Sequence, residues 1–257
     1  MYFDTHCHLN SDDFGKDIPG YLKRAHEKGV DHFIVVGWDV PSSLKAVELA
    51  EQYPEVYAAV GFHPCNIFNV PEDQFAIVKH LFTHPKVVAV GEIGLDFYWN
   101  KLEDERELQR KYFARQIELA NRFKKPIIIH SREASLETLK ILQENRPLFG
   151  GVMHCYAASK EMVDSFVALG LYISLGGPVT FSNARVSKEV AAYVPLKNLL
   201  IETDSPYLSP MPFRGKQNES AYLPLIAAEI GRIKNLDAED IGEWTTRNAA
   251  MLFHVKL

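Results

Sequence analysis

Two histidines stand two residues apart near the start of the chain, in the stretch MYFDTHCHLN. Side chains two apart on a β-strand point to the same side, so the imidazoles of His6 and His8 would project together while Cys7 points away. Two neutral imidazoles and a carboxylate suit Zn, Mn, Fe or Co. The pair therefore indicates a metal site if this stretch is a strand, although such a pair also arises by chance.

Comparable residues follow other short apolar runs of the chain. Imidazoles or carboxylates come at the ends of six of eight such runs: His6 and His8, His63, Glu92 and Asp96, His130, His154, and Glu202 and Asp204. Taken singly, each has a plainer interpretation, such as pairing of Glu92 with Arg132 or capping of a turn by Asp204. Six such positions in one chain predict a shared site.

The elements that must position these side chains alternate along the chain. Near-continuous apolar runs, typical of parallel strands covered on both faces, occupy 2–6, 32–37, 56–61, 87–91, 126–130, 151–154, 171–176 and 199–204. Helix-like stretches occupy 18–29, 41–53, 72–82, 102–123, 133–145, 159–170, 219–234 and 238–253. This order predicts an α/β fold, a (β/α)8 TIM barrel. The alternative, an open doubly wound sheet, usually has a Gly-rich turn where this chain has His-Cys-His.

Length and composition limit the class of protein. The 257 residues, 47% hydrophobic and 24% charged, contain no linker or repeat, so we expect a single domain over residues 1–257 and a monomer. A net charge of −5 argues against a protein that packages nucleic acid, but not against an enzyme that handles one phosphodiester at a time. Three cysteines and no leader or membrane-length run lead us to expect a cytoplasmic protein whose cysteines are small core residues.

The barrel prediction divides the candidate ligands between neighbouring strands. Active sites of TIM barrels lie at the C-terminal ends of the strands, and the last strand is next to the first. We therefore expect two groups, one of His6, His8 and Asp204 and one of Glu92, His130 and His154. Each group would bind one divalent ion, and the two oxygens of Glu92 could bridge both. Asp4 lies deeper on the first strand and is expected to orient an imidazole.

The chain resembles a known family, the TatD family of metal-dependent hydrolases and deoxyribonucleases, within the amidohydrolase-like barrel superfamily. The matching motifs, in order, are DTHCHL, VGFHP, GEIGLDFY, IIHSREA, HCYA, GGPVTF, LIETDSPYL and PFRGKQNES. The resemblance implies two divalent ions (Mg, Mn or Zn) held by His6, His8, Glu92, His130, His154 and Asp204. It also implies hydrolysis of a nucleic acid, with 3′–5′ exonuclease action on single-stranded DNA as the expected activity.

Roles follow for the other polar residues around such a site. Metal ions lower the pKa of a bound water, and Asp204 is either the general base for that water or a ligand only. Glu202 is expected to tune the water or contact substrate, unless it pairs with Arg132 or a loop amide. Candidate substrate contacts are His63, Arg132, Arg214 and Lys216, with the aromatic side chains of Phe97, Tyr98, Trp99 and Tyr156 available either to stack on bases or to pack a lid.

Two other functions fit the same residues. The family includes proteins resembling D-aminoacyl-tRNA deacylases, which would use the same metal chemistry on an acyl ester. A metal-binding regulatory protein without turnover is the third class, and the presence of every candidate ligand weighs against it.

Overall fold

The computed structural model describes residues 1–15 and 17–257, and within these the strands and helices alternate as the sequence predicts. The strands form one eight-stranded sheet in the order β1 to β8, and the fold is a TIM barrel. The strands are β1 (Tyr2–Cys7), β2 (Val30–Val36), β3 (Val56–Val60), β4 (Val87–Asp96), β5 (Ile127–Arg132), β6 (Gly151–Met153), β7 (Leu171–Leu175) and β8 (Leu199–Ile201).

The helices follow the strands in turn. They are α1 (Ile18–His26), α2 (Val40–Gln52), α3 (Glu72–Leu81), α4 (Glu103–Arg122), α5 (Ser135–Glu144), α6 (Val163–Ala168), α7 (Arg185–Tyr193), α8 (Leu223–Lys234) and α9 (Ala238–Phe253). Within the described ranges, no helix combines the length and apolar character that a bilayer crossing requires.

The chain divides into two compact units. Unit 1 comprises Met1–Val35, Cys155–Val163 and Ile173–Leu257, and unit 2 comprises Val36–His154 and Asp164–Tyr172. The single domain expected from the sequence stays a prediction.

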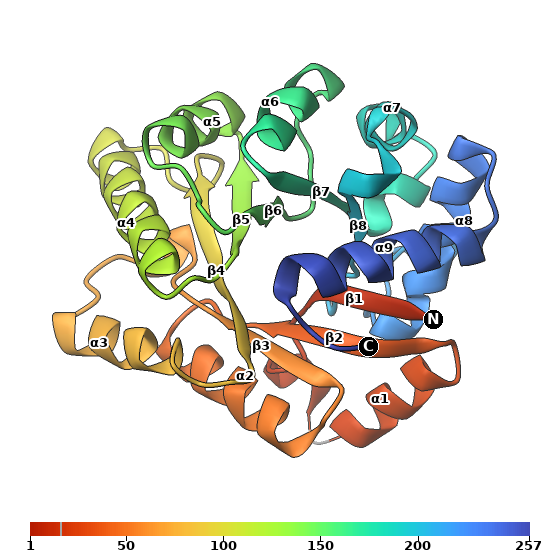
Figure 1. Cartoon of the computed structure of the whole chain (residues 1–257), viewed down its shortest axis with the longest axis horizontal. Helices are drawn as coiled ribbons and strands as arrows, with labels where there is room; N and C mark the ends of the chain where they lie inside the picture. The colour runs from red at the N-terminus through yellow and green to blue at the C-terminus, as the bar shows by residue number, and fades with distance from the viewer. Residues whose placement is uncertain (16) are drawn as a thin grey trace. The chain divides into compact units, whose positions relative to one another are not determined.

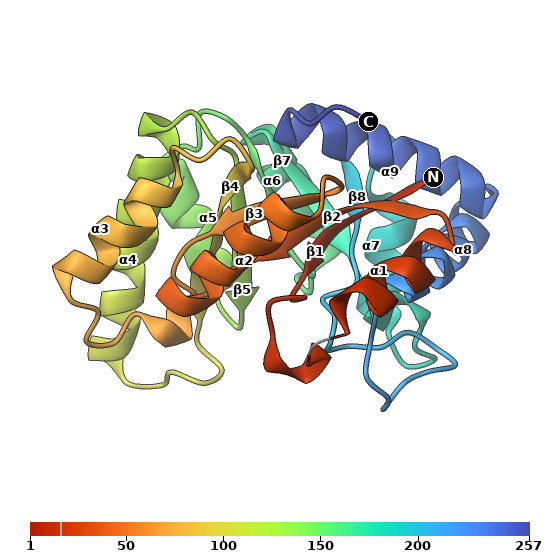
Figure 2. The ribbon, with the colours of Figure 1, turned by 90° about the horizontal axis from the view of Figure 1, so that it is seen from below.

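In unit 1, β1 is paired on both sides. It is parallel to β2, and at its C-terminal end it meets the segment that follows β8, where Cys7 and Ser205 form a parallel bridge. Helix α9 packs against β1 and β8 and contacts α8 (Figure 1). The loops after β1 and β8 lie at the same end of the unit (Figure 2), where Gln217 donates a hydrogen bond to the Asp13 carbonyl at 3.0 Å.

In unit 2, β4 is the central element. All ten of its residues are buried, and it pairs in parallel with β3 and β5. Helix α4 packs on it and sends two buried glutamines inward, Gln109 to the backbone of Asp96 and Gln116 to the backbone of Phe62. These amide side chains satisfy backbone groups just where β3 and β4 end, so they fix the positions of the following residues.

The ends of β4 and β8 differ most from the prediction. Strand β4 runs five residues further, so that Glu92 lies inside it and Asp96 ends it, because pairing with β5 continues to Arg132. Gly94 permits this register, since its φ is +143° and a Cβ atom there would meet the His130 carbonyl oxygen. Strand β8 ends at Ile201, and Asp204 has a left-handed φ of +56° that extended structure does not accommodate.

The prediction also lacks any element between residues 177 and 198. The structure has α7 there, flanked by short 3-10 turns at Gly177–Thr180 and Leu196–Asn198. Helix α7 has only nine residues and buries only Val190 and Ala191. So short an apolar face gives a weak periodic signal in a sequence rich in turn residues.

Candidate metal centre

The first group of predicted ligands converges at the end of β1. His6 lies within the strand and His8 just past it, and their Nε2 atoms are 3.2 Å apart. The Oδ1 atom of Asp204 lies 3.8 Å from the first of these nitrogens and 3.4 Å from the second. Donors bound about 2.1 Å from one tetrahedral ion are about 3.4 Å apart, so the three atoms have the spacing of a metal's ligands.

The backbone explains this convergence. The Asp204 N–H donates to the His6 carbonyl at 2.9 Å, and the His8 N–H donates to the Ser205 carbonyl at 2.8 Å. The side chain of Cys7 points away from the imidazoles, as predicted, and its Sγ donates to the Ile34 carbonyl. The closing of β1 against the segment after β8 thus brings residues 198 positions apart into one group.

Asp4 holds this segment in place. Its carboxylate accepts hydrogen bonds from the Thr203 N–H and hydroxyl at 3.0 and 2.6 Å, and from the His6 N–H at 3.3 Å. Burial raises the pKa of Asp4 to about 6, although the hydrogen bonds from Thr203 oppose the rise. Asn218 donates to the Thr203 carbonyl at 2.8 Å from the other side. Asp4 therefore positions the backbone that carries Asp204; orientation of an imidazole, as first expected, stays a prediction.

The second group forms around Glu92 in unit 2. Its Oε1 atom lies 2.8 Å from His130 Nδ1, 3.5 Å from His154 Nε2 and 3.8 Å from His63 Nε2. Glu92, His130 and His63 offer ligand atoms that all lie within 4.8 Å of one another. His130 is on β5 and His154 directly follows β6, so neighbouring parallel strands supply the group.

The contacts of His130 test whether this group suits a cation. Its Nε2 lies 2.9 Å from Asp96 Oδ2, and its Nδ1 faces Glu92. A neutral ring that donates from Nε2 presents a lone pair at Nδ1 toward a carboxylate oxygen, and two acceptors so close require a proton or a metal ion between them. The donor set fits a divalent ion bound through Nδ1.

The pKa directions agree with this arrangement. Burial lowers the pKa of His130, but the hydrogen bonds to Asp96 and Glu92 outweigh it and raise the pKa above its ordinary value. Burial raises the pKa of Asp96, yet the contacts with His130 and the Trp99 N–H lower it overall. Asp96 thus stays ionised, as a partner that fixes the imidazole should. Sequence patterns place Asp96 at a strand end but assign it no role. The residue that could have indicated this role is His130, on the neighbouring strand.

A backbone hydrogen bond orients the ring of His63. Its Nδ1 accepts a hydrogen bond from the Cys65 N–H at 3.1 Å, so the neutral ring carries its proton on Nε2. That N–H faces the Glu92 group, and the ring meets His130 edge-on with centroids 4.4 Å apart. This tautomer suits a hydrogen-bond donor to an anionic oxygen, which was one of the two interpretations of the sequence.

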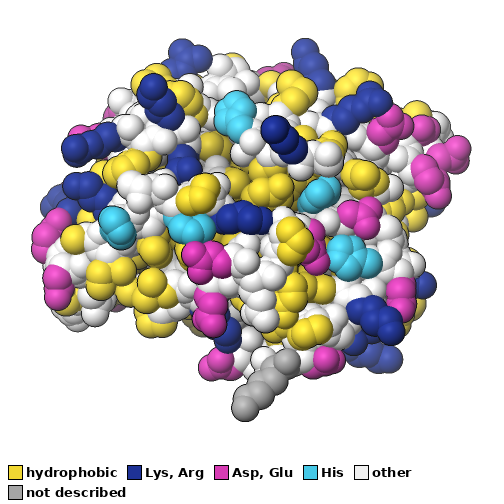
Figure 3. All heavy atoms as spheres, turned by 60° about the horizontal axis from the view of Figure 1, so that its bottom comes forward, with side chains coloured by type: hydrophobic (Ala, Val, Ile, Leu, Met, Phe, Trp, Pro, Cys, Tyr) yellow, Lys and Arg dark blue, Asp and Glu magenta, His cyan; other side chains and the backbone are white. Residues whose placement is uncertain are grey.

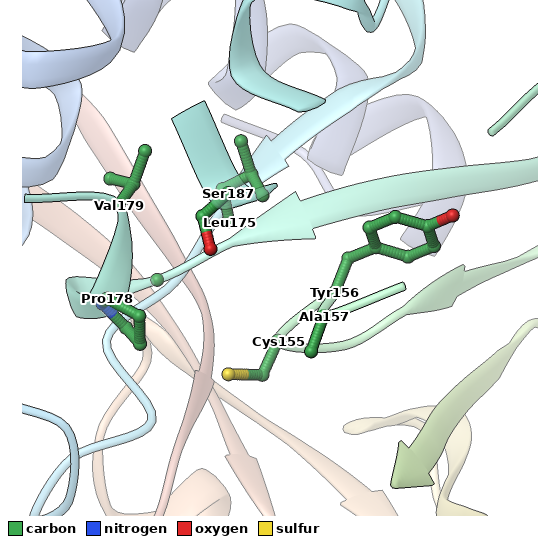
Figure 4. A pocket seen from close by; sticks show the side chains of 8 residues that line it. Cys155, Tyr156, Ala157, Leu175, Pro178, Val179 and Ser187 are labelled. Carbon is green, nitrogen blue, oxygen red and sulfur yellow. The ribbon is translucent and has the colours of Figure 1, made fainter. Parts of the chain in front are cut away.

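Glu202 is buried and its Oε1 accepts a hydrogen bond from the Cys155 N–H at 2.6 Å. The sequence leaves Arg132 or a loop amide as structural partners of Glu202, and the structure shows the loop amide. The sequence predicts a strand over the run 199–204, but β8 ends at Ile201, so Glu202 and Asp204 lie beyond the strand. Cys155 faces a cavity of about 50 Å³ that Tyr156, Leu175 and Ser187 also line (Figure 4), enough for one or two waters. Cys7 is fully buried, whereas Cys65 and Cys155 are only partly so.

The predicted substrate contacts lie in different units. Arg132, at the end of β5, places its guanidinium carbon 3.9 Å from the centre of the Tyr98 ring. Arg214, in the loop after β8, lies 4.2 Å from the Phe181 ring, and the exposed Lys216 lies 5.9 Å from the Phe213 ring. Phe97 and Tyr156 are buried, whereas Trp99 is exposed. On the face drawn in Figure 3, basic and acidic side chains are interspersed.

Comparison with known proteins identifies the family. Residues 3–254 match the model of the TatD related DNases. The chain belongs to this family. A relative from Bacillus subtilis, named uncharacterized metal-dependent hydrolase YabD, is 42% identical over 99% of this chain and 100% of its own length. A relative from Edwardsiella piscicida, 33% identical over 98% of this chain and 99% of its own, is named 3′-5′ ssDNA/RNA exonuclease TatD.

A solved structure agrees. The crystal structure of YJJV, a TatD homologue from Escherichia coli, is 31% identical and superposes with a TM-score of 0.93 over 99% of this chain and 98% of that chain. The protein is therefore a metal-dependent hydrolase of the TatD family with the TIM-barrel fold.

Proposed function

We propose that this protein is a divalent-metal-dependent nuclease, a 3′–5′ exonuclease that hydrolyses phosphodiester bonds of single-stranded DNA. The observation that carries the proposal is that two groups of imidazole and carboxylate atoms each have the spacing of metal ligands. A relative 33% identical to this chain is named a 3′-5′ ssDNA/RNA exonuclease, which supports the choice of substrate. In this proposal His6, His8 and Asp204 bind one ion, and Glu92, His130 and His154 bind another.

Such ions, when bound, lower the pKa of a water molecule and neutralise charge on a phosphoryl oxygen. The chain's own residues do the rest. Asp204 is partly exposed, with 13% of its side chain accessible, so its second oxygen can orient the water that attacks phosphorus and accept its proton. His63 donates its Nε2 hydrogen to a non-bridging phosphate oxygen as negative charge grows there.

The basic side chains contribute orientation. Net charge is −5, and acidic groups intersperse the basic ones on the face drawn in Figure 3, so a global basic field does not hold the substrate. Arg132 and Arg214 are exposed, and each contacts one or two phosphates of a short strand in this proposal. Affinity for long duplex DNA is therefore expected to be low.

The test uses oligonucleotides labelled at one end. Single strands labelled at the 5′ or the 3′ end are incubated with the protein and Mg²⁺, Mn²⁺ or Zn²⁺, beside a D-aminoacyl-tRNA. A 3′–5′ exonuclease shortens the 5′-labelled strand stepwise and releases the 3′ label as a mononucleotide. Intact oligonucleotides together with a deacylated tRNA would overturn the proposal in favour of the acyl-ester hydrolase.

Matched variants assign the activity to this protein. His130→Ala is expected to abolish cleavage, while His80→Ala, which removes an exposed histidine on α3, leaves it unchanged. Equal loss in both, or loss in neither, would show that the cleavage does not come from the proposed centre.

A further inference from the structure

Three side chains of unit 2 form an exposed cluster of an arginine on two aromatic rings, here called the Tyr98–Trp99–Arg132 cluster. The rings of Tyr98 and Trp99 meet edge-on with centroids 4.8 Å apart. The guanidinium carbon of Arg132 lies 3.9 Å from the Tyr98 ring centre and 5.7 Å from that of Trp99. Trp99 is 66% exposed and Tyr98 36% exposed. Two adjoining exposed aromatic rings with a guanidinium against them form a surface on which a planar ligand can stack.

The cluster is joined to a proposed metal ligand through one carboxylate. Asp96 Oδ2 lies 2.9 Å from His130 Nε2. The other oxygen, Oδ1, accepts hydrogen bonds from the N–H groups of Tyr98 and Trp99 at 3.0 and 2.9 Å. Arg132 itself is two residues beyond His130 on β5. The position of the aromatic pair is thereby fixed relative to the imidazole.

The loop that carries the aromatic pair is also held from α4. The Gln109 amide donates to the Asp96 carbonyl at 3.2 Å and to Asn100 Oδ1 at 2.9 Å. Arg106 donates to the carbonyls of Phe97 and Asn100 at 3.3 and 3.2 Å. A loop ordered before binding loses little conformational entropy when a ligand arrives.

We propose that the Tyr98–Trp99–Arg132 cluster is a subsite for one unpaired nucleotide of the substrate, with the base stacked on Trp99 and the adjoining phosphate bound by Arg132. The proposal rests on the nuclease function above and names the part of the strand that this surface holds. Every base has an aromatic face, so stacking selects single strands without selecting a sequence. Arginine stacked on a ring engages it with the guanidinium face, and its N–H edge suits a phosphate.

Binding measured without turnover tests the subsite. The probe is a fluorescein-labelled phosphorothioate oligothymidylate, followed by anisotropy with the metal-loaded protein. Trp99→Ala is expected to weaken binding about tenfold, and Trp99→Phe, which keeps a ring, much less. The matched control is Trp244→Ala on α9, whose indole is 42% exposed, and it should bind like the wild type.

Salt dependence separates a phosphate contact from a structural effect. Arg132→Gln is expected to reduce the slope of log affinity against log salt by about 0.7, the release expected for one phosphate of a single strand. A general loss of structure would weaken binding without this change in slope. Thermal unfolding of each variant, followed by circular dichroism, should match that of the wild type.

The outcomes separate the subsite from the nuclease proposal. If Trp99→Ala and Arg132→Gln both bind the oligonucleotide like the wild type, the subsite is wrong, even when the wild type cleaves DNA. Weak binding of the oligonucleotide by the wild type itself would also overturn it. If the variants lose binding but the wild type cleaves no oligonucleotide with any of the three metals, the subsite stands as a nucleotide-binding surface and the nuclease proposal fails.

Discussion

Asp96 and His130 face each other from neighbouring strands, with Oδ2 of the acid 2.9 Å from Nε2 of the ring. This contact engages Nε2 of His130, and Nδ1 is directed at Glu92. A carboxylate that orients an imidazole in this way also increases its basicity as a ligand. The same acid holds the N–H groups of Tyr98 and Trp99, so one buried side chain sets both the ligand and the loop beside it.

The first prediction concerns Asp96→Asn. An amide cannot offer oxygen both to His130 and to the two backbone N–H groups, so either the tautomer of the ring or the loop is disturbed. We expect metal affinity to fall about 10- to 100-fold with the fold retained. Isothermal titration with Zn²⁺ or Mn²⁺ measures this, and ¹⁵N spectra of the histidines report the tautomer. Asp73→Asn on α3 is the matched control, and equal affinity in both variants would contradict the prediction.

The second prediction concerns Asp204→Ala. Loss of the carboxylate removes a ligand from the His6 and His8 group, so activity is expected to be abolished while the fold survives. The number of ions bound per chain, measured by elemental analysis after dialysis, should drop. Because φ at this position is +56°, Asp204→Asn serves as a second variant that tolerates the left-handed backbone. Full activity in either variant would refute the assignment of Asp204.

The third prediction concerns the pH dependence of stability in the metal-free protein. Burial raises the pKa of Asp4 to about 6 from an ordinary value of 3.8. Between pH 3.8 and pH 6 the folded state therefore binds more protons than the unfolded state. The contribution of Asp4 to stability is fully present below pH 3.8 and is lost as the pH rises through 6. The loss should reach about 3 kcal/mol.

Asp4→Asn measures this contribution directly. The difference in free energy of unfolding between wild type and variant, from urea titrations in chelator, should shift against the wild type by that amount from about pH 4 to pH 7. A difference independent of pH would show that Asp4 does not titrate between the two states.

The fourth prediction concerns thiol reactivity. Burial, with the charges of Asp96 and Glu92, raises the pKa of Cys65 to about 12. At pH 8 its thiolate fraction is therefore about a thousandfold below that of an ordinary thiol, and alkylation by iodoacetamide should be slower in proportion. The rate should rise about tenfold per pH unit up to pH 11. Peptide mass spectrometry of native and urea-unfolded protein measures it, and rapid native labelling at pH 8 would be the contrary result.

The sequence by itself determined the alternation of strands and helices and the identities of the residues at the strand ends. Apolar runs and amphipathic stretches are local patterns, so the order β1 to β8 could be inferred from them. The spacing of His6 and His8 is local in the same sense. Once a barrel was inferred, the meeting of Asp204 with β1 followed, because a closed sheet makes its first and last strands neighbours.

Only the tertiary structure decided which side chains hold the candidate ligands. Asp96 meets His130, 34 residues away, because β4 continues past Glu92 with Gly94 opposite His130 in the register. Glu202 meets the Cys155 N–H, 47 residues away, after β8 has ended. Register, strand length and left-handed turns arise from pairing between distant segments. A local sequence pattern does not show where such pairing ends.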